Sequence, residues 1–326
     1  MNILIIGGTK FVGRALTDVA LERGHEVTLF HRGQTGEELF PNVQRIHGDR
    51  NHDLDRLKGQ WDVVVDTCAY RPREVEAVSE RLRNHAKAFA FVSTISVYDD
   101  MSVPGIDEGA PLASYDGPET DEVNGTTYGP FKVQCEEVVH DRWGGDALIV
   151  RPGLIVGPHD PTDRFTYWPW RVAQGGKMVA PGEPGRGIQY VDAHDLARFA
   201  IEGLERNLRG TFNVVGPESP VPFEPFLETC RKVTSSTAEF VWIDDSKLEA
   251  HEVGAMVEMP FWLPASSPKQ AGLFAIDASR ARSEGLSHRP MAEIIRDTVE
   301  WAMSRPVDHT WRAGLAIEKE RALLAE

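Results

Sequence analysis

Short apolar runs alternate with stretches of helical periodicity through the first two thirds of the chain. The first run, at residues 1–6, is continuously apolar after Asn2 and precedes a helical pattern through Leu16, Val19 and Ala20. Continuous apolar runs are typical of strands buried on both faces, and their alternation with helices predicts an α/β fold with a doubly wound parallel sheet. The expected strands are residues 1–6, 27–30, 43–46, 62–65, 89–92, 147–150 and 212–215.

The later part of the chain departs from this alternation. Residues 157–187 are dense in Trp, Pro and Arg, and the tail mixes Pro-rich loops with helical stretches at 291–303 and 311–324. Between these regions, a helical pattern at 192–204 leads back to the last strand. We therefore expect a sheet domain of residues 1–156 and about 188–216, and a smaller C-terminal lobe of about 157–187 and 217–326.

A glycine turn connects the first strand to the first helix. A strand, a glycine turn and a helix N-terminus together direct backbone N–H groups and the helix dipole at a pyrophosphate. Lys10 replaces the usual middle glycine, and the alternative is a glycine-rich turn without a ligand. The expected phosphate site comprises Gly7, Gly8, Thr9, Lys10, Phe11, Val12 and Gly13.

Tyr128 and Lys132 lie four residues apart, so a helix would place both side chains on one face. A nearby cation favours the phenolate, and it lowers the tyrosine pKa from about 10 toward the range in which a general acid or base works. Pro130 fits this interpretation only if the helix begins close to Tyr128. The alternative is the start of an ordinary amphipathic helix.

Four further segments accompany the glycine turn and the Tyr/Lys pair at residues 89–98, 151–158, 189–197 and 210–216. With them, the chain resembles an extended short-chain dehydrogenase/reductase of the NAD-dependent epimerase/dehydratase family. The resemblance implies a Rossmann NAD(P)-binding domain, a substrate-binding lobe and hydride transfer. It also implies that Tyr128 is the acid/base, that Lys132 lowers its pKa and holds the nicotinamide ribose, and that Thr94, three residues before Val97, hydrogen-bonds the reacting oxygen.

The end of the second strand bears on the choice of cofactor. His31 and Arg32 stand where an NAD enzyme usually presents a carboxylate to the ribose, and Arg32 could pair with a 2′-phosphate. By resemblance, Lys10 also stands where NADP-using reductases often carry a basic residue, and Asp49 matches a position that contacts the adenine amine. NADP(H) is therefore favoured over NAD(H). The alternatives are a solvated Arg32 and a turn-forming Asp49.

Substrate contacts are expected after the strand exit at 151–158. Arg164 and Arg186 would supply positive charge there, and Tyr167 or Trp168 a flat wall on which a ring could stack. The alternative is that the aromatic residues form the core of the small lobe and the arginines its solvated rim. The acidic segment 99–122 is either a solvated loop or a mobile flap beside the site.

Two features separate the chain from sugar-nucleotide epimerases. No asparagine stands where those enzymes carry a fourth catalytic residue. Asp66-Thr67-Cys68-Ala69-Tyr70 resembles an atypical subgroup that also includes plastid stem-loop RNA-binding proteins. Three functions stay open: an oxidoreductase, epimerase or dehydratase acting on a sugar nucleotide or related small polar carbonyl or alcohol, a nucleotide-sensing protein, and an RNA-binding protein.

Composition narrows the choice of partners. The formal net charge of −15 over 326 residues repels nucleic acids and anionic membranes, so a small-molecule substrate is expected and a homodimer stays open. The chain has no membrane-length apolar stretch and no basic signal-peptide region, which predicts a cytoplasmic protein. The three cysteines are scattered and the eleven histidines lack paired ligand spacing, so no metal is expected.

Overall fold

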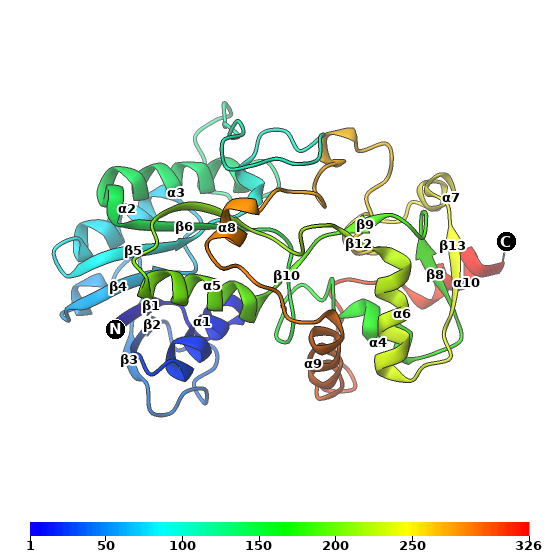
Figure 1. Ribbon diagram of the computed structural model, residues 1–326, viewed down its shortest axis with the longest axis horizontal. Helices are drawn as coiled ribbons and strands as arrows, with labels where there is room; N and C mark the ends of the chain where they lie inside the picture. Colours follow the sequence, from blue (N-terminus) through cyan, green and yellow to red (C-terminus); the bar gives the residue numbers. More distant parts are fainter. Residues whose placement is uncertain (326) are drawn as a thin grey trace.

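A parallel sheet of seven strands forms the centre of the computed structural model, which describes residues 1–325 (Figure 1). Its strand order is β11-β6-β5-β4-β1-β2-β3. The chain adds β2 and β3 on one side of β1 and the later strands on the other, so the order of addition changes side between β1 and β4. Every strand expected from the apolar runs is present, which confirms the doubly wound parallel sheet. The strands are β1 (Asn2–Ile6), β2 (Glu26–His31), β3 (Gln44–His47), β4 (Trp61–Asp66), β5 (Ala86–Val92), β6 (Ala147–Pro152) and β11 (Gly210–Val214).

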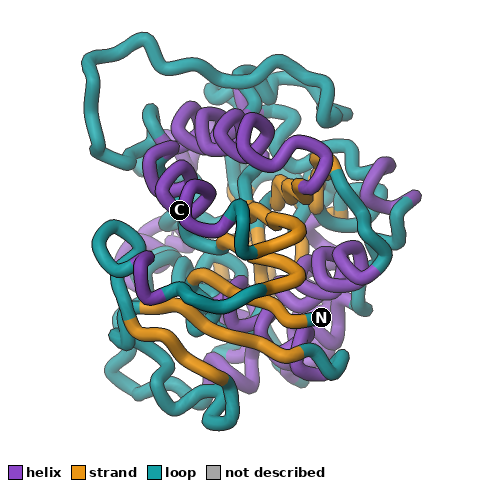
Figure 2. The backbone as a smooth tube through the Cα atoms, turned by 90° about the vertical axis from the view of Figure 1, so that its left-hand side faces the viewer, coloured by secondary structure: helices purple, strands orange, loops and turns teal. Residues whose placement is uncertain are grey.

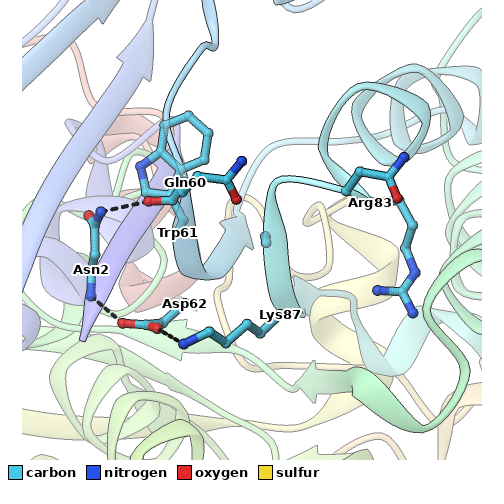
Figure 3. Close-up of a pocket in the computed structure, with 8 residues that line it drawn as sticks. Asn2, Gln60, Trp61, Asp62, Arg83 and Lys87 are labelled. Carbon is cyan, nitrogen blue, oxygen red and sulfur yellow. Dashed lines mark hydrogen bonds and ion pairs between the residues drawn. The ribbon is translucent and has the colours of Figure 1, made fainter.

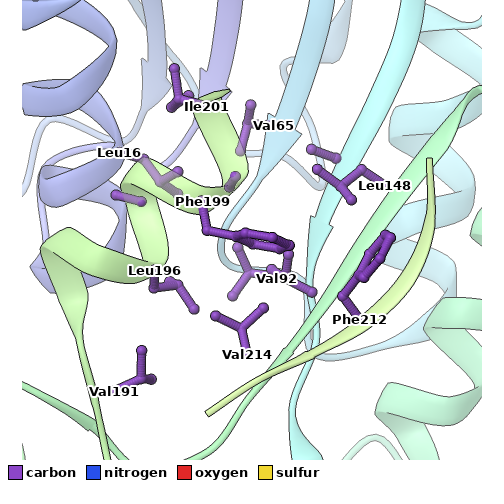
Figure 4. Packing of buried hydrophobic residues seen from close by; sticks show 14 of the residues in the cluster. Leu16, Val65, Val92, Leu148, Val191, Leu196, Phe199, Ile201, Phe212 and Val214 are labelled. Carbon is purple, nitrogen blue, oxygen red and sulfur yellow. The ribbon is translucent and has the colours of Figure 1, made fainter. Parts of the chain in front are cut away.

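Helices cover both faces of this sheet, which is why its central strands are apolar on both sides (Figures 1 and 2). Helices α1 (Phe11–Glu22) and α5 (Ala193–Glu205) pack together on one face, and α2 (Pro72–Leu82) and α3 (Tyr128–Trp143) on the other. Figure 4 shows the first interface, where Phe199 of α5 meets Phe212 of β11 with ring centroids 5.8 Å apart.

A second hydrophobic core lies outside the sheet and is rich in aromatic residues. Helices α4, α6 and α9 pack around it, and β8 pairs with β13. Its elements are β7 (Ile155–Val156), α4 (Tyr167–Ala173), β8 (Lys177–Pro181), β9 (Gly187–Ile188), β12 (Val221–Pro222), α6 (Phe223–Thr234), β13 (Glu239–Ile243), α7 (Asp245–Ala250), α9 (Met291–Met303) and α10 (Ile317–Ala325). Strand β10 (Val191–Asp192) pairs with β7, but its Val191 packs in the sheet core. Short 3₁₀ turns are η1 (Leu54–Arg56), η2 (Ile95–Val97), η3 (Gly144–Asp146) and η4 (Pro268–Gln270).

Two parts of the tail differ from the sequence expectation. The last helix begins at Ile317 rather than at residue 311, because Gly314 adopts a φ of 121° that ends any helix there. Helix α8 (Ser279–Ser283) and its neighbours Ile276 and Leu286 pack with the sheet core, although this stretch falls inside the expected C-terminal lobe.

The acidic segment 99–122 is a loop that is tied at both ends. Its first half exchanges backbone hydrogen bonds with residues 269–277, among them Gly272 N–H to the Met101 carbonyl at 2.7 Å and Gly105 N–H to the Ala275 carbonyl at 2.7 Å. Its second half meets the start of α2, where Arg73 pairs with Asp121. The segment is therefore attached to residues 269–277 at one end and to α2 at the other. Among residues 1–325, no helix has both the length and the apolar character needed to cross a bilayer.

Candidate active site

The glycine turn lies at the carboxyl end of β1 in a conformation that requires glycine. Gly7 and Gly8 have φ values of 102° and 90°, and a Cβ on Gly7 would lie 2.4 Å from Thr67 Oγ1. A Cβ on Gly13 would lie 2.7 Å from the Gly8 nitrogen, so this third glycine lets α1 approach the turn. Lys10 is exposed and provides no side-chain cap for α1. The first N–H groups of α1 are thus left for a ligand, and the turn fits a pyrophosphate.

The ends of β2 and β3 bring the expected adenosine residues together. Arg32 is exposed, and the pKa of Asp49 is lowered by a hydrogen bond from Asn51 and by the charge of Arg32. Glu37, from the loop after β2, places Oε1 3.8 Å from His31 Nδ1. A carboxylate is therefore present near the end of β2, although His31 and Arg32 occupy the sequence position where one is usual, because the loop folds back over the strand end.

Tyr128 is the first residue of α3, so Pro130 falls in the first turn as its missing N–H requires. Thr94 lies close enough to Tyr128 to lower the pKa of its phenol, against the effect of burial. It follows β5 and accepts from Ser96 N–H at 3.1 Å. Gly129 makes this approach possible, since a Cβ there would lie 2.1 Å from the Ser96 carbonyl oxygen. Ser93, by contrast, is directed away from this pair.

The pKa of Tyr128 is raised rather than lowered, and burial is the main cause. The hydrogen bond with Thr94 and the positive charge of Arg164 act in the opposite direction. Lys132 is buried, and its Nζ donates to the carbonyls of Ala69 at 2.9 Å and Val92 at 2.7 Å. The expectation that Lys132 lowers the pKa of Tyr128 is therefore wrong for this structure. The ammonium of Lys132 is bound by those two carbonyls instead. Burial also lowers the pKa of Lys132 to about 8.

Tyr70 is a site residue that the sequence argument missed. Its ring centroid lies 6.2 Å from that of Tyr128, and Lys132 Nζ lies 5.9 Å from the Tyr70 centroid. Tyr70 is 45% exposed, so it presents a flat aromatic face beside the acid/base pair. The available signal was its position, four residues after the last residue of β4 at the carboxyl edge of the sheet.

A buried ion pair supports this edge from behind. Arg151 on β6 donates to Glu136 on α3 at 2.6 Å, and both residues are at least 95% buried. Ser93 donates to the same carboxylate at 2.5 Å, and Arg151 also donates to Tyr98 Oη at 3.2 Å. The network joins the strand end that carries Thr94 to the helix that begins with Tyr128.

The four expected substrate residues have different positions. Arg164 is half-buried and acts electrostatically on Tyr128. Tyr167 and Trp168 are buried in the second core, where Trp168 Nε1 donates to the Pro260 carbonyl at 3.2 Å, so the expectation that they form a stacking wall is wrong. Arg186 pairs with Asp245 at 2.7 Å. Tyr167 and Trp168 thus pack among the helices of the second lobe and are not available to a ligand.

Substitution should separate these roles. Trp168→Ala is expected to lower the free energy of unfolding by about 3–5 kcal/mol, because it empties a fully buried site. Arg164→Ala should cost no more than about 1 kcal/mol, since it removes one partly exposed side chain. Urea unfolding of both variants measures the difference. Equal stability losses would place Arg164 in the core as well.

Two cavities in the described part of the chain lie at opposite edges of the sheet. One of about 300 Å³ lies where β1, β4 and β5 begin and is lined by Asn2, Trp61 and Lys87 among others (Figure 3). Ligands of open α/β sheets bind at the carboxyl ends of strands, so this cavity is not the expected site. The other, of about 540 Å³, includes Asn51, His52, Arg71 and Arg73, and it lies at the carboxyl edge close to Asp49.

Known proteins share both sequence and fold with this chain. Residues 3–77 match the model of the NAD dependent epimerase/dehydratase family. The chloroplast stem-loop binding protein of 41 kDa b from Arabidopsis thaliana is 27% identical over 256 residues, which cover 71% of this chain but only 62% of that protein. Epimerase family protein SDR39U1 from Homo sapiens is 24% identical over 247 residues, 70% of this chain and 79% of that protein.

Among solved structures, UDP-glucuronic acid 4-epimerase from Bacillus cereus, in complex with NAD, aligns with a TM-score of 0.66. The alignment covers 93% of this chain and 99% of the epimerase, at 18% identity. At that identity the likeness concerns the fold alone.

Proposed function

We propose that this chain, whose residues 3–77 match the NAD dependent epimerase/dehydratase family, is an NAD(P)-dependent oxidoreductase, epimerase or dehydratase. The proposed substrate is a sugar nucleotide or a related small polar carbonyl or alcohol. The observation that carries the proposal is the convergence of Tyr128, Thr94 and Lys132 at the sheet edge that also carries the uncapped glycine turn.

The proposed roles follow from the contacts of each residue. Backbone N–H groups of the glycine turn would hold the pyrophosphate of a nicotinamide dinucleotide, which supplies hydride transfer when bound. Tyr128 would exchange a proton with the substrate oxygen, and Thr94 would orient that oxygen. A phenol with a pKa of about 10 is protonated at neutral pH, and burial raises the pKa of Tyr128 further, so Tyr128 carries the proton that it would donate. Arg164 would counter the negative charge that develops when it does.

We assign substrate binding to the lobe of about residues 157–187 and 217–326, which contributes Arg164. Tyr70 of the sheet domain would complete the site. Arg164 follows the strand exit at 151–158, and Tyr70 offers its exposed face to a ring. Both lie close to Tyr128 by the interactions described above. A substrate with an anionic group and a flat moiety fits this pair.

The cofactor proposal retains NADP(H) as preferred, because two exposed cations lie at the expected cofactor site. Arg32 follows β2, where the adenosine would bind, and Lys10 lies in the glycine turn that would hold the pyrophosphate. Arg32→Ala is then expected to reduce the ratio of NADP(H) to NAD(H) affinity by about one to two decades, the loss of one charge-assisted bond. Isothermal titration with both cofactors measures the ratio, and Lys58→Ala, an exposed cation outside the site, is the control. Tighter binding of NAD(H) by the unmodified protein would give Glu37 the decisive role instead.

One experiment tests the function itself. Native mass spectrometry of the purified protein would identify a retained dinucleotide, and thermal-shift measurements would follow with nucleotide sugars and small carbonyl compounds. A ligand at 100 times its Kd adds about 2.7 kcal/mol to the free energy of unfolding, so a true substrate should raise the melting temperature. A protein that binds neither dinucleotide would refute the proposal.

RNA binding is the second candidate function, because the Arabidopsis relative is named a stem-loop binding protein. The net charge of −15 opposes it, because phosphate contacts supply most non-specific affinity. Filter binding of a stem-loop RNA over a salt series distinguishes the two. Tight, salt-sensitive binding would favour this candidate.

A further inference from the structure

Three metal-binding side chains meet where β2 and β3 end. His31 and His47 are direct partners in the parallel pairing of these strands, with ring centroids 5.2 Å apart. Glu37 reaches them from the intervening loop, with Oε1 3.3 Å from His47 Nε2 and 3.8 Å from His31 Nδ1. One donor atom from each of the three lies within 4.8 Å of the others.

The structure leads us to propose that His31, Glu37 and His47 form a site for a divalent transition-metal ion such as Zn²⁺. With metal–ligand bonds of about 2.0–2.2 Å, tetrahedral ligand atoms lie about 3.3–3.6 Å apart, close to the two spacings that Glu37 makes. Two imidazoles and one carboxylate leave a fourth position for water. This donor set suits zinc, and it lies outside the proposed acid/base site, at the strand ends where the adenosine of the cofactor is expected.

His31 offers its Nδ1 as the metal-binding atom. Gly33 N–H donates to this nitrogen at 3.1 Å, so Nδ1 carries a lone pair, which is directed at Gly33 in the metal-free protein. Its Nε2 has no hydrogen-bond partner among the described residues, although the residue is 91% buried. A metal would replace the Gly33 hydrogen bond with a stronger interaction.

The loop that carries Glu37 is held without a ligand. Arg45 on β3 donates to the Glu37 carbonyl at 2.7 Å and to the Phe40 carbonyl at 3.3 Å. These bonds fix the backbone of Glu37 beside the two rings, while its side chain stays 47% exposed. Because Glu37 is the one anionic group of the three, it would contribute the charge that attracts a cation. Glu37 should be the ligand whose loss matters most.

Metal binding to the full-length protein tests the site directly. After removal of metal with EDTA, titration with ZnCl₂ by calorimetry should show one saturable Zn²⁺ per chain, and CoCl₂ should produce a visible spectrum of low-coordinate Co²⁺. Glu37→Gln and His47→Ala should each weaken Zn²⁺ binding at least about tenfold. Both side chains are about half exposed, so these variants should fold, and circular dichroism checks this.

Two neighbouring residues are the controls. Glu38→Gln removes an exposed carboxylate next to Glu37, and His52→Ala removes an exposed imidazole after β3. Both should bind Zn²⁺ like the unmodified protein. Absence of one-to-one binding, or equal affinity in the folded Glu37→Gln variant, would overturn the proposal. Metal uptake is measured without a dinucleotide, so failure of the metal site and failure of dinucleotide binding can be told apart.

Discussion

Tyr128→Phe is expected to reduce kcat by at least about 10²–10⁴-fold, because it removes the hydroxyl that is proposed to transfer the proton. Cofactor affinity should stay within a few-fold, since the ring keeps its place at the start of α3 beside Tyr70. Steady-state kinetics with a substrate from the thermal-shift panel measures the first effect. Titration with the dinucleotide measures the second.

Tyr115→Phe is the matched control for this experiment. Tyr115 contacts Phe131 of the same helix with ring centroids 6.1 Å apart, but it belongs to the acidic loop and has no role in the proposed chemistry. Its loss should change kcat by less than a few-fold. Turnover by Tyr128→Phe at a similar rate would show that another group, with Tyr70 the nearest phenol, transfers the proton.

Local patterns in the sequence were sufficient for the sheet and for part of the site. A strand such as β4 is buried on both faces, so its position can be read from consecutive apolar residues. Thr94 and Tyr128 follow a strand and begin a helix, respectively, so their meeting depends on elements that periodicity predicts. Pro130 even fixed where the helix had to begin.

The errors concern partners that long-range packing decides. Trp168 had the same sequence signal as a residue that stacks on a ligand, and only the packing of α4 against α6 shows that it is core. Glu37 lies six residues beyond the end of β2, and no periodicity predicts that its loop returns to the strand. Lys132 was placed on the correct helix face, but its carbonyl partners on β5 and after β4 are distant in sequence.

The buried pair between Arg151 and Glu136 gives a stability effect as large as the one that we expect for Trp168→Ala. Arg151→Met should lower the free energy of unfolding by about 3–5 kcal/mol, because Glu136 would remain buried without its cation. The hydrogen bond from Ser93 cannot compensate for a full charge. Urea unfolding at neutral pH measures the change.

Two further variants show whether the isolated charge is the cause. The double variant Arg151→Met with Glu136→Leu removes both charges and should recover most of the lost stability, as buried pairs often do when apolar groups replace them. Arg142→Ala breaks an exposed pair with Glu76 and should cost no more than about 1 kcal/mol. If the double variant is no more stable than Arg151→Met, the loss arises from the packing of the arginine and its bond to Tyr98 instead. In that case, the network of Arg151, Glu136 and Ser93 stabilises the strand end that carries Thr94 mainly by side-chain packing rather than by the attraction between the two charges.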